Sequence, residues 1–190
     1  MSHQISKQNI FNFLKAKSVV IEIASNSNIE IKEEKNIDTS KLQKVNITSL
    51  KNSSKYWQLN PETPTFLQPN SKKVESIILE ETEDNILNIF LIEMKSGSIN
   101  RRAENDICEK FSASLSWVYL LLNLLNNKEN QKIKVFGILV AQKDMKWNEN
   151  KDLDIFISTS IRYKKKSFYT PDTQMNISFK ELTEEKGNTK

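Results

Sequence analysis

Two long apolar segments on either side of an amphipathic segment constrain the fold of this chain more than any other feature. Residues 86–95 and 132–141 are rich in Ile, Leu, Val and Phe, which is typical of buried strands. Between them, residues 102–126 carry apolar side chains at steps of three and four, the periodicity of a helix. These positions are Ile107, Phe111, Leu115, Val118, Leu122 and Leu125. The pattern predicts a strand, a helix and a second strand in succession.

Flanking segments extend this order. Residues 73–79 and 153–162 are further predicted strands, and the acidic residues 80–85 form a turn whose charges are predicted to be a solvated tip. With an amphipathic helix at 5–17, this predicts an α/β chain with a mixed central β-sheet flanked by helices.

The first third of the chain is harder to interpret. Residues 18–24 and 28–34 are β-rich and predict a hairpin around the polar turn between them. Residues 35–72 are polar and contain three prolines, which predicts an irregular segment with a short helix near 40–52. A long irregular segment within a domain often shapes a binding site.

Size and composition indicate one soluble domain over residues 1–190, with its core at about 73–162 and a flexible tail at about 183–190. The N-terminus lacks the continuous apolar core of a signal peptide. The most apolar part of the predicted helix is too short to span a bilayer. These features predict a cytoplasmic protein with no membrane partner.

Several kinds of catalysis are disfavoured by composition. His3 is the only histidine and Cys108 the only cysteine, so Ser-His-Asp or Cys-His catalysis and a His-ligated zinc site are improbable. Cys108 is interpreted as a buried core residue. Any metal would need oxygen ligands, which suits Mg²⁺ or Mn²⁺. The net charge of +4 permits a polyanionic partner without requiring one.

Two acids are predicted to meet across the hairpin. If the strands pair around Asp84, Glu75 lies opposite Glu93 with Cβ atoms about 5 Å apart. Lys95 shares the face of Glu93 because side chains alternate along a strand. Facing carboxylates repel one another. Lys95 neutralises one of these charges, whereas a divalent cation would neutralise both.

This arrangement contains the parts of metal-assisted phosphodiester hydrolysis. Mg²⁺ or Mn²⁺ held by Glu75 and Glu93 would bind a phosphate oxygen and lower the pKa of a bound water. The backbone carbonyl of Met94 is a candidate further ligand. Lys95 would orient or deprotonate the water, or stabilise charge that develops on the phosphoryl group.

The order of these features resembles the PD-(D/E)xK nuclease superfamily. In that pattern an acid opens one strand, a tight hairpin follows, and (D/E)-x-K ends the next strand before a helix. Here the pattern is Glu75, Glu93 and Lys95. The first acid is normally Asp, and Glu reaches one methylene further. The resemblance covers about 73–141 and implies a restriction-endonuclease-like core of order αβββαβ, with cation binding by the two acids and Lys95 as the catalytic lysine.

The resemblance also suggests supporting residues. Many members carry an acid on a helix before the core strands, for which Glu22 and Glu30 are alternatives. Some place a polar residue on the helix after the motif, and Lys110 is preferred to Glu109 for that position.

Basic residues at two places are candidates for binding a nucleic-acid backbone. Arg101 and Arg102 stand at the start of the predicted helix, where the macrodipole disfavours cations. Lys164, Lys165 and Lys166 follow the last predicted strand. Solvated surface side chains are the simpler interpretation of both groups.

The resulting functional hypothesis is a Mg²⁺-dependent endonuclease that hydrolyses DNA, acting in restriction or in defence against foreign DNA. RNA is a substrate that the sequence does not separate from DNA. The alternative is a catalytically inactive module of the same fold that binds nucleic acid or a protein partner. Either form is compatible with a homodimer.

Overall fold

The chain is built on a six-stranded mixed sheet. The computed structural model describes residues 12, 14–24, 27–32, 41–48, 50–61, 72–96, 101–124, 132–142 and 163–184. In spatial order the strands are β1 (Val20–Ile23), β4 (Lys55–Leu59), β5 (Ser76–Glu81), β6 (Ile86–Lys95), β7 (Lys132–Ala141) and β8 (Tyr163–Tyr169). Neighbouring strands run antiparallel from β1 to β6, whereas β7 is parallel to β6 and β8 is parallel to β7. The prediction of an α/β chain with a mixed sheet is confirmed.

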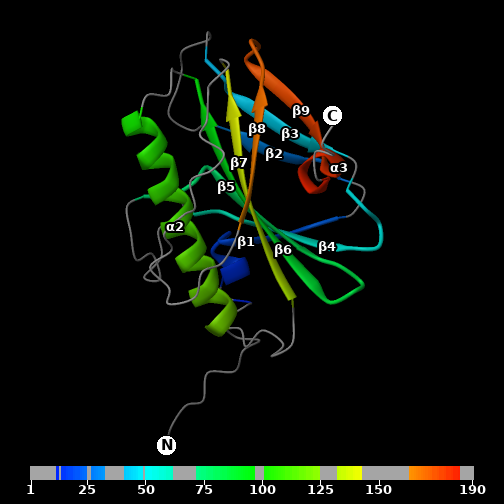
Figure 1. The fold of residues 1–190 in the computed structure, drawn as a ribbon. Helices are drawn as coiled ribbons and strands as arrows, with labels where there is room; N and C mark the ends of the chain where they lie inside the picture. Colours follow the sequence, from blue (N-terminus) through cyan, green and yellow to red (C-terminus); the bar gives the residue numbers. More distant parts are fainter. Residues whose placement is uncertain are drawn as a thin grey trace, which may run out of the picture.

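One long helix and a second sheet cover the two faces of this sheet. The helix α2 (Arg101–Leu124) follows β6 and packs on one face (Figure 1). The other face is covered by a three-stranded sheet of β2 (Ile29–Lys32), β3 (Lys44–Thr48) and β9 (Gln174–Ser178), with the short helix α3 (Phe179–Thr183). Helices were expected to flank the central sheet, and α2 does so on one face, whereas a second sheet with only the short α3 covers the other.

Strand β6 lies at the centre of both cores. Ile89 and Leu91 belong to the apolar cluster that includes Phe111 of α2. Phe90 points to the other face, where its ring lies 5.2 Å from that of Phe179. Because side chains alternate along a strand, the odd-numbered residues of β6 face α2 and the even-numbered ones face the small sheet. Burial on both faces explains why the β6 segment reads as a continuous apolar run.

The predicted hairpin register is confirmed. Ser76 pairs with Ile92, and the ladder continues to Glu81 and Leu87, so the hairpin is centred on Asp84. The turn closes through a hydrogen bond of 3.1 Å from the backbone N–H of Asn85 to the carbonyl of Thr82. Asn85 has φ 57°, in the left-handed region that Asn tolerates better than most residues.

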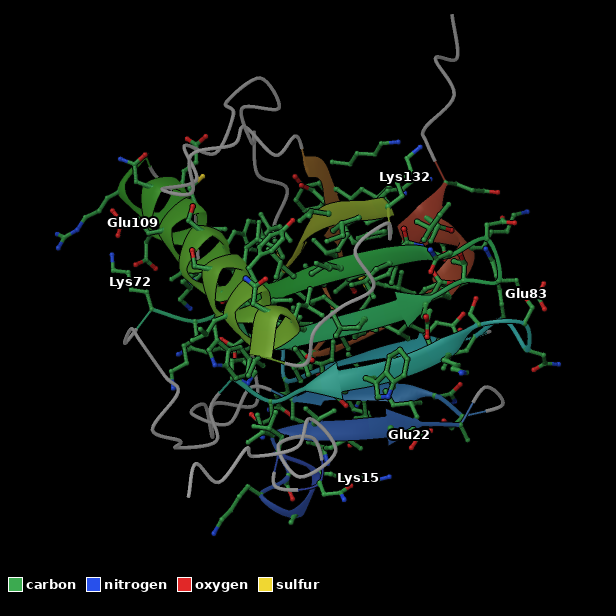
Figure 2. The ribbon with its side chains drawn as sticks, turned by 90° about the horizontal axis from the view of Figure 1, so that it is seen from below. Lys15, Glu22, Lys72, Glu83, Glu109 and Lys132 are labelled. Carbon is green, nitrogen blue, oxygen red and sulfur yellow. The ribbon has the colours of Figure 1, made fainter. Side chains whose placement is uncertain are left out.

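The predicted solvated tip of this hairpin is correct in part. Glu83 and Asp84 are exposed, and Figure 2 shows Glu83 at the end of the hairpin. Glu80 is fully buried, so for this residue the prediction is wrong. Glu80 belongs to β5 rather than to the turn, and it faces the small sheet.

Two predictions for the first third are wrong. Segments 18–24 and 28–34 do not form a hairpin, because β1 pairs with β4 whereas β2 pairs with β3 in the other sheet. Segment 35–72 contains the strands β3 and β4 rather than a helix near 40–52. Val45 and Ile47 show the alternation of a half-buried strand, and their partners are remote in the sequence.

Other predictions fall at the limits of the described chain. Leu14–Ala16 are helical and Leu14 is buried, whereas most of the predicted helix 5–17 lies outside the described residues. The predicted strand 153–162 also lies outside them. The last strand of the large sheet, β8, instead includes the basic segment that was expected to follow a strand. At the C-terminus, α3 ends at Thr183 and residues 185–190 are outside the described part.

Within the described ranges, no helix has the length and hydropathy needed to cross a bilayer.

Candidate functional site

Four charged side chains gather where the C-terminal end of β6 meets α2. The Nζ atom of Lys110 lies 2.6 Å from Oε1 of Glu93 and 4.0 Å from Oε1 of Glu75. Nζ of Lys95 lies 3.0 Å from the same Oε1 of Glu93. The predicted residues Glu75, Glu93 and Lys95 are thus brought together, and Lys110 joins them.

Local sequence explains this placement. Glu93 and Lys95 are odd-numbered residues of β6 and therefore face α2. The strand predicted over 73–79 begins only at Ser76, so Glu75 directly precedes β5, one residue beyond the Ser76–Ile92 pair that ends the β5–β6 ladder. Glu75 and Glu93 are linked through Lys110, which contacts both carboxylates. Lys110 is three residues after the buried Ile107, so it lies on the helix face that packs on the sheet. Strand alternation and helical spacing together aim the four side chains at one point.

Burial differs sharply among the four. The side chain of Glu93 is 0% exposed, whereas those of Lys110, Glu75 and Lys95 are 19%, 21% and 28% exposed. A buried carboxylate is tolerated only if it is paired. Burial opposes the charge of Lys110, but the carboxylates of Glu93 and then Glu75 hold the pKa of Lys110 above its usual value. The cluster therefore holds two negative and two positive groups.

One oxygen of Glu93 is left over. Both lysines contact Oε1, whereas the buried Oε2 has no hydrogen-bond partner among the described residues. A buried acceptor without a partner is unfavourable and uncommon in folded proteins. An oxygen atom of this kind, in a cluster that also contains the carboxylate of Glu75, is suited to a hard divalent cation. These residues fit such an ion. The charges of the two acids are already balanced by the two lysines, so charge balance alone does not require a cation.

The ligand set supplied by the described residues is small. Within the described ranges, no group of three or more Asp, Glu, His or Cys side chains is positioned to hold a metal. Met94 lies between Glu93 and Lys95, beyond the point where the β5–β6 ladder ends at Ile92, and it is aligned with Val140 of β7. The side chain of Met94 is buried on the opposite face of β6, so Met94 could contribute only its backbone carbonyl as a ligand.

Neither of the two candidate additional acids belongs to the cluster around Glu93, although Glu30 lines a cleft that Glu75 also lines. Glu22 is exposed on β1, where it pairs with Lys15 at 3.1 Å (Figure 2). Glu30 on β2 pairs with Lys32 at 2.6 Å and with Lys44. Hydrogen bonds from these two lysines, of which that from Lys32 has the larger effect, lower the pKa of Glu30 to about 2. Neither acid has an ion pair with the cluster around Glu93.

A cleft opens beside Glu75. Its volume is about 300 Å³, and its lining combines amide, hydroxyl and charged groups with apolar walls. The lining residues are Ile21, Glu30, Ile31, Lys32, Gln58, Leu59, Asn60, Glu75 and Ser76. Within it, Nε2 of Gln58 donates to Oγ of Ser76 at 3.0 Å. Sequence reasoning missed this cleft because four strands from two sheets build it.

The predicted basic residues have different surroundings. Arg101 is the first residue of α2, and Arg102 is exposed. Lys164 is exposed on β8, and Lys165 follows it on the same strand. Lys166 instead donates to the carbonyl oxygens of Glu181, at 2.7 Å, and Glu184 at the end of α3. Lys166 therefore has a helix-capping contact that the prediction did not include.

Two other residues of α2 were singled out from the sequence, and neither is placed as predicted. Glu109, the less favoured helix candidate, pairs with Lys72 on the outside of α2 (Figure 2). Cys108 is half-buried rather than fully buried.

A second buried carboxylate lies on the other face of the sheet. Oε1 of Glu80 accepts hydrogen bonds from Ser54 at 3.0 Å and Tyr56 at 3.1 Å, and Oε2 accepts one from Asn88 at 2.6 Å. Burial, together with the charge of Glu80, raises the pKa of Tyr56 to about 12. Because its donors satisfy both oxygens, this network is interpreted as structural.

No family model, curated protein or solved structure matches the chain. Its function therefore has to be inferred from the residues of the site themselves.

Proposed function

We propose that this chain is a divalent-metal-dependent nuclease that hydrolyses DNA phosphodiester bonds at Glu75, Glu93 and Lys95. The observation that carries the proposal is the buried carboxylate of Glu93, in which both lysines contact one oxygen and the other has no hydrogen-bond partner in the described part of the chain. The second acid, Glu75, belongs to the same cluster through Lys110. Charged groups that converge next to a cleft are typical of binding and catalytic sites.

The order of elements supports a restriction-endonuclease-like core. Strands β4, β5 and β6 form an antiparallel meander, α2 follows, and β7 returns parallel to β6. This is the βββαβ part of the order that the PD-(D/E)xK resemblance implies. The (D/E)-x-K position falls at the end of the third of these strands, as in that superfamily.

Each residue then has a chemical role. Glu93 and Glu75 would hold Mg²⁺ or Mn²⁺, with the Met94 carbonyl as a further candidate ligand. When bound, the cation would supply Lewis-acid stabilisation of the phosphoryl group and lower the pKa of a water. Lys95, held at the mouth of the site by its ion pair with Glu93, would orient the attacking water or stabilise charge on the phosphoryl oxygens.

The surroundings suggest how a nucleic-acid strand would bind. The cleft beside Glu75 would accept a nucleotide next to the scissile phosphate, with Gln58 and Ser76 as polar contacts. Arg102 and Lys164 are exposed cations that would contact phosphates. Restriction or defence against foreign DNA is the biological setting that we propose, with RNA as the alternative substrate.

A second candidate has one specific observation in its favour. Lys95 and Lys110 already balance both carboxylates, so the cluster can persist without a cation, as a catalytically inactive binding module would require. Such a module would bind nucleic acid or a protein partner without cleaving.

The deciding experiment incubates the purified protein with supercoiled plasmid, linear duplex and single-stranded DNA or RNA, with Mg²⁺, Mn²⁺ or EDTA. We expect metal-dependent cleavage that Lys95→Ala reduces by roughly 100-fold or more. Lys72→Ala is the matched control, because Lys72 pairs on the outside of α2. A full cleavage rate in Lys95→Ala would refute the mechanism, and binding without cleavage by the wild-type protein would favour the inactive module.

A further inference from the structure

Lys110 occupies the place between the two carboxylates. Its Nζ atom lies 2.6 Å from Glu93 and 4.0 Å from Glu75, so a single ammonium group contacts one acid closely and lies at the ion-pair limit of the other. Two acids that share one cation in this manner are also the two that would chelate a metal. An ammonium ion and a divalent cation cannot occupy the same few ångströms, because both the space and the charge of the acids are shared.

We infer that Lys110 is a resident counter-ion, which holds the acid pair in the metal-free protein and which a divalent cation must displace in order to bind. This inference rests on the proposed function and adds a regulation of its site: the affinity for metal is set by competition with a side chain of the same chain.

The two lysines of the cluster are not equivalent in this respect. Lys95 contacts Glu93 alone among the ion pairs of the cluster, and it is the more exposed of the two. Lys110 contacts both acids and comes from the helix, so it can withdraw without changing the strand that carries Glu93. Only Lys110 is therefore placed to compete directly with a shared cation.

Displacement has a structural consequence for Lys110. Its side chain is 19% exposed, so part of it already reaches solvent, and a lysine displaced from the acids would turn outward. A lysine released from the acids at the mouth of the site would then be available to a phosphate of the substrate. The same residue would thus stabilise the resting site and, after metal binding, contact the nucleic acid.

The test measures Mn²⁺ affinity of the full-length protein by electron paramagnetic resonance of free Mn²⁺, at pH 7 and low salt, without any substrate. Lys110→Met keeps the length of the side chain and removes its charge. We expect this variant to bind Mn²⁺ at least about tenfold more tightly than wild type, because a positive charge is removed from between the ligands.

Three further variants control the interpretation. Lys110→Gln gives a second, polar replacement in case the methionine variant does not fold, and it should also bind more tightly. Lys72→Met removes a lysine that pairs with α2 but not with Glu93, and its affinity should stay within about twofold of wild type. Glu93→Gln should lose measurable binding.

The possible failures are distinguishable. If wild type binds Mn²⁺ and the Lys110 variants bind equally or more weakly, Lys110 is not a competitor and this inference is wrong, whereas the proposed nuclease survives. If neither wild type nor any variant binds Mn²⁺ at millimolar concentration, the metal-dependent function fails and this inference fails with it.

Discussion

Replacement of Glu93 by Gln tests both the resting and the metal-bound forms of the site. The variant keeps the shape of the side chain and removes the charge that two ammonium groups contact at 2.6 and 3.0 Å. With an effective dielectric constant of about 20, each pair is worth about 6 kcal/mol before desolvation. Removing the fully buried charge also removes its desolvation cost of several kcal/mol. Because the two lysines are partly hydrated as well, most of the lost Coulomb attraction is offset.

We expect a net loss of about 2–3 kcal/mol in the free energy of unfolding of the metal-free protein. For a chain of this size the loss corresponds to a fall in Tm of about 5–10 °C. Adding Mn²⁺ at about 100 times its Kd should stabilise wild type by about 2.7 kcal/mol, which raises Tm by a similar amount. The Glu93→Gln variant should not respond to Mn²⁺.

The assay is a thermal melt followed by circular dichroism, with and without MnCl₂, for wild type, Glu93→Gln and Glu109→Gln. Glu109 is 59% exposed and pairs with Lys72, so its replacement should change stability by less than about 1 kcal/mol and leave the Mn²⁺ response intact. A Glu93→Gln variant that Mn²⁺ stabilises as strongly as wild type would refute the placement of the ion at this carboxylate.

Other perturbations probe the cleft, the buried network and the basic strand. Gln58→Ala should raise KM for DNA by about 2- to 10-fold with little change in kcat, measured by steady-state cleavage, whereas the exposed Gln174→Ala should leave KM unchanged. Since folding raises the pKa of Tyr56 from about 10 to about 12, its protonated form contributes stability that is complete below pH 10 and is lost as pH rises to about 12. Urea unfolding should show about 3 kcal/mol of this alkaline loss in wild type and not in Tyr56→Phe. Lys164→Met should reduce the slope of the logarithm of the DNA-binding constant against the logarithm of salt concentration by about 1, the value of one phosphate contact. Lys166→Met should leave that slope unchanged and lower the free energy of unfolding by about 0.5–1 kcal/mol, because its contact with the end of α3 is lost.

The centre of the fold could be predicted from the sequence because its signals are local and long. Residues 86–95 and 132–141 are strands with the predicted bounds, and the predicted helix 102–126 differs from α2 by one or two residues at each end. The acidic turn centres the hairpin on Asp84, which predicts the register of the β5–β6 ladder, although Glu75 lies one residue beyond the last pair of that ladder.

The parts that could not be predicted depend on pairing between segments remote in the sequence. Strand β3 pairs with β2 and also, in parallel, with β9, more than 100 residues later in the chain. A five-residue strand such as 44–48, within a polar segment, carries too little periodicity to be separated from a loop. The burial of Glu80 was missed for a similar reason, because Tyr56 belongs to the strand β4, which was not predicted, and Ser54 directly precedes that strand.

The site was also predictable only in part. Glu75, Glu93 and Lys95 follow from one hairpin and could be predicted, and Lys110 was a candidate because the PD-(D/E)xK resemblance implies a polar residue on the helix after the motif. What the sequence did not indicate is that Lys110 lies between the two acids, since that depends on how closely α2 packs on β6.

Anomalous diffraction from a crystal of the wild-type protein grown with Mn²⁺ would test most directly whether these two acids share a divalent cation. We predict an anomalous peak within ligand distance of the carboxylates of Glu75 and Glu93, with the side chain of Lys110 turned away from both. A map without a peak there, in which Lys110 still bridges the acids at millimolar Mn²⁺, would contradict the proposed site.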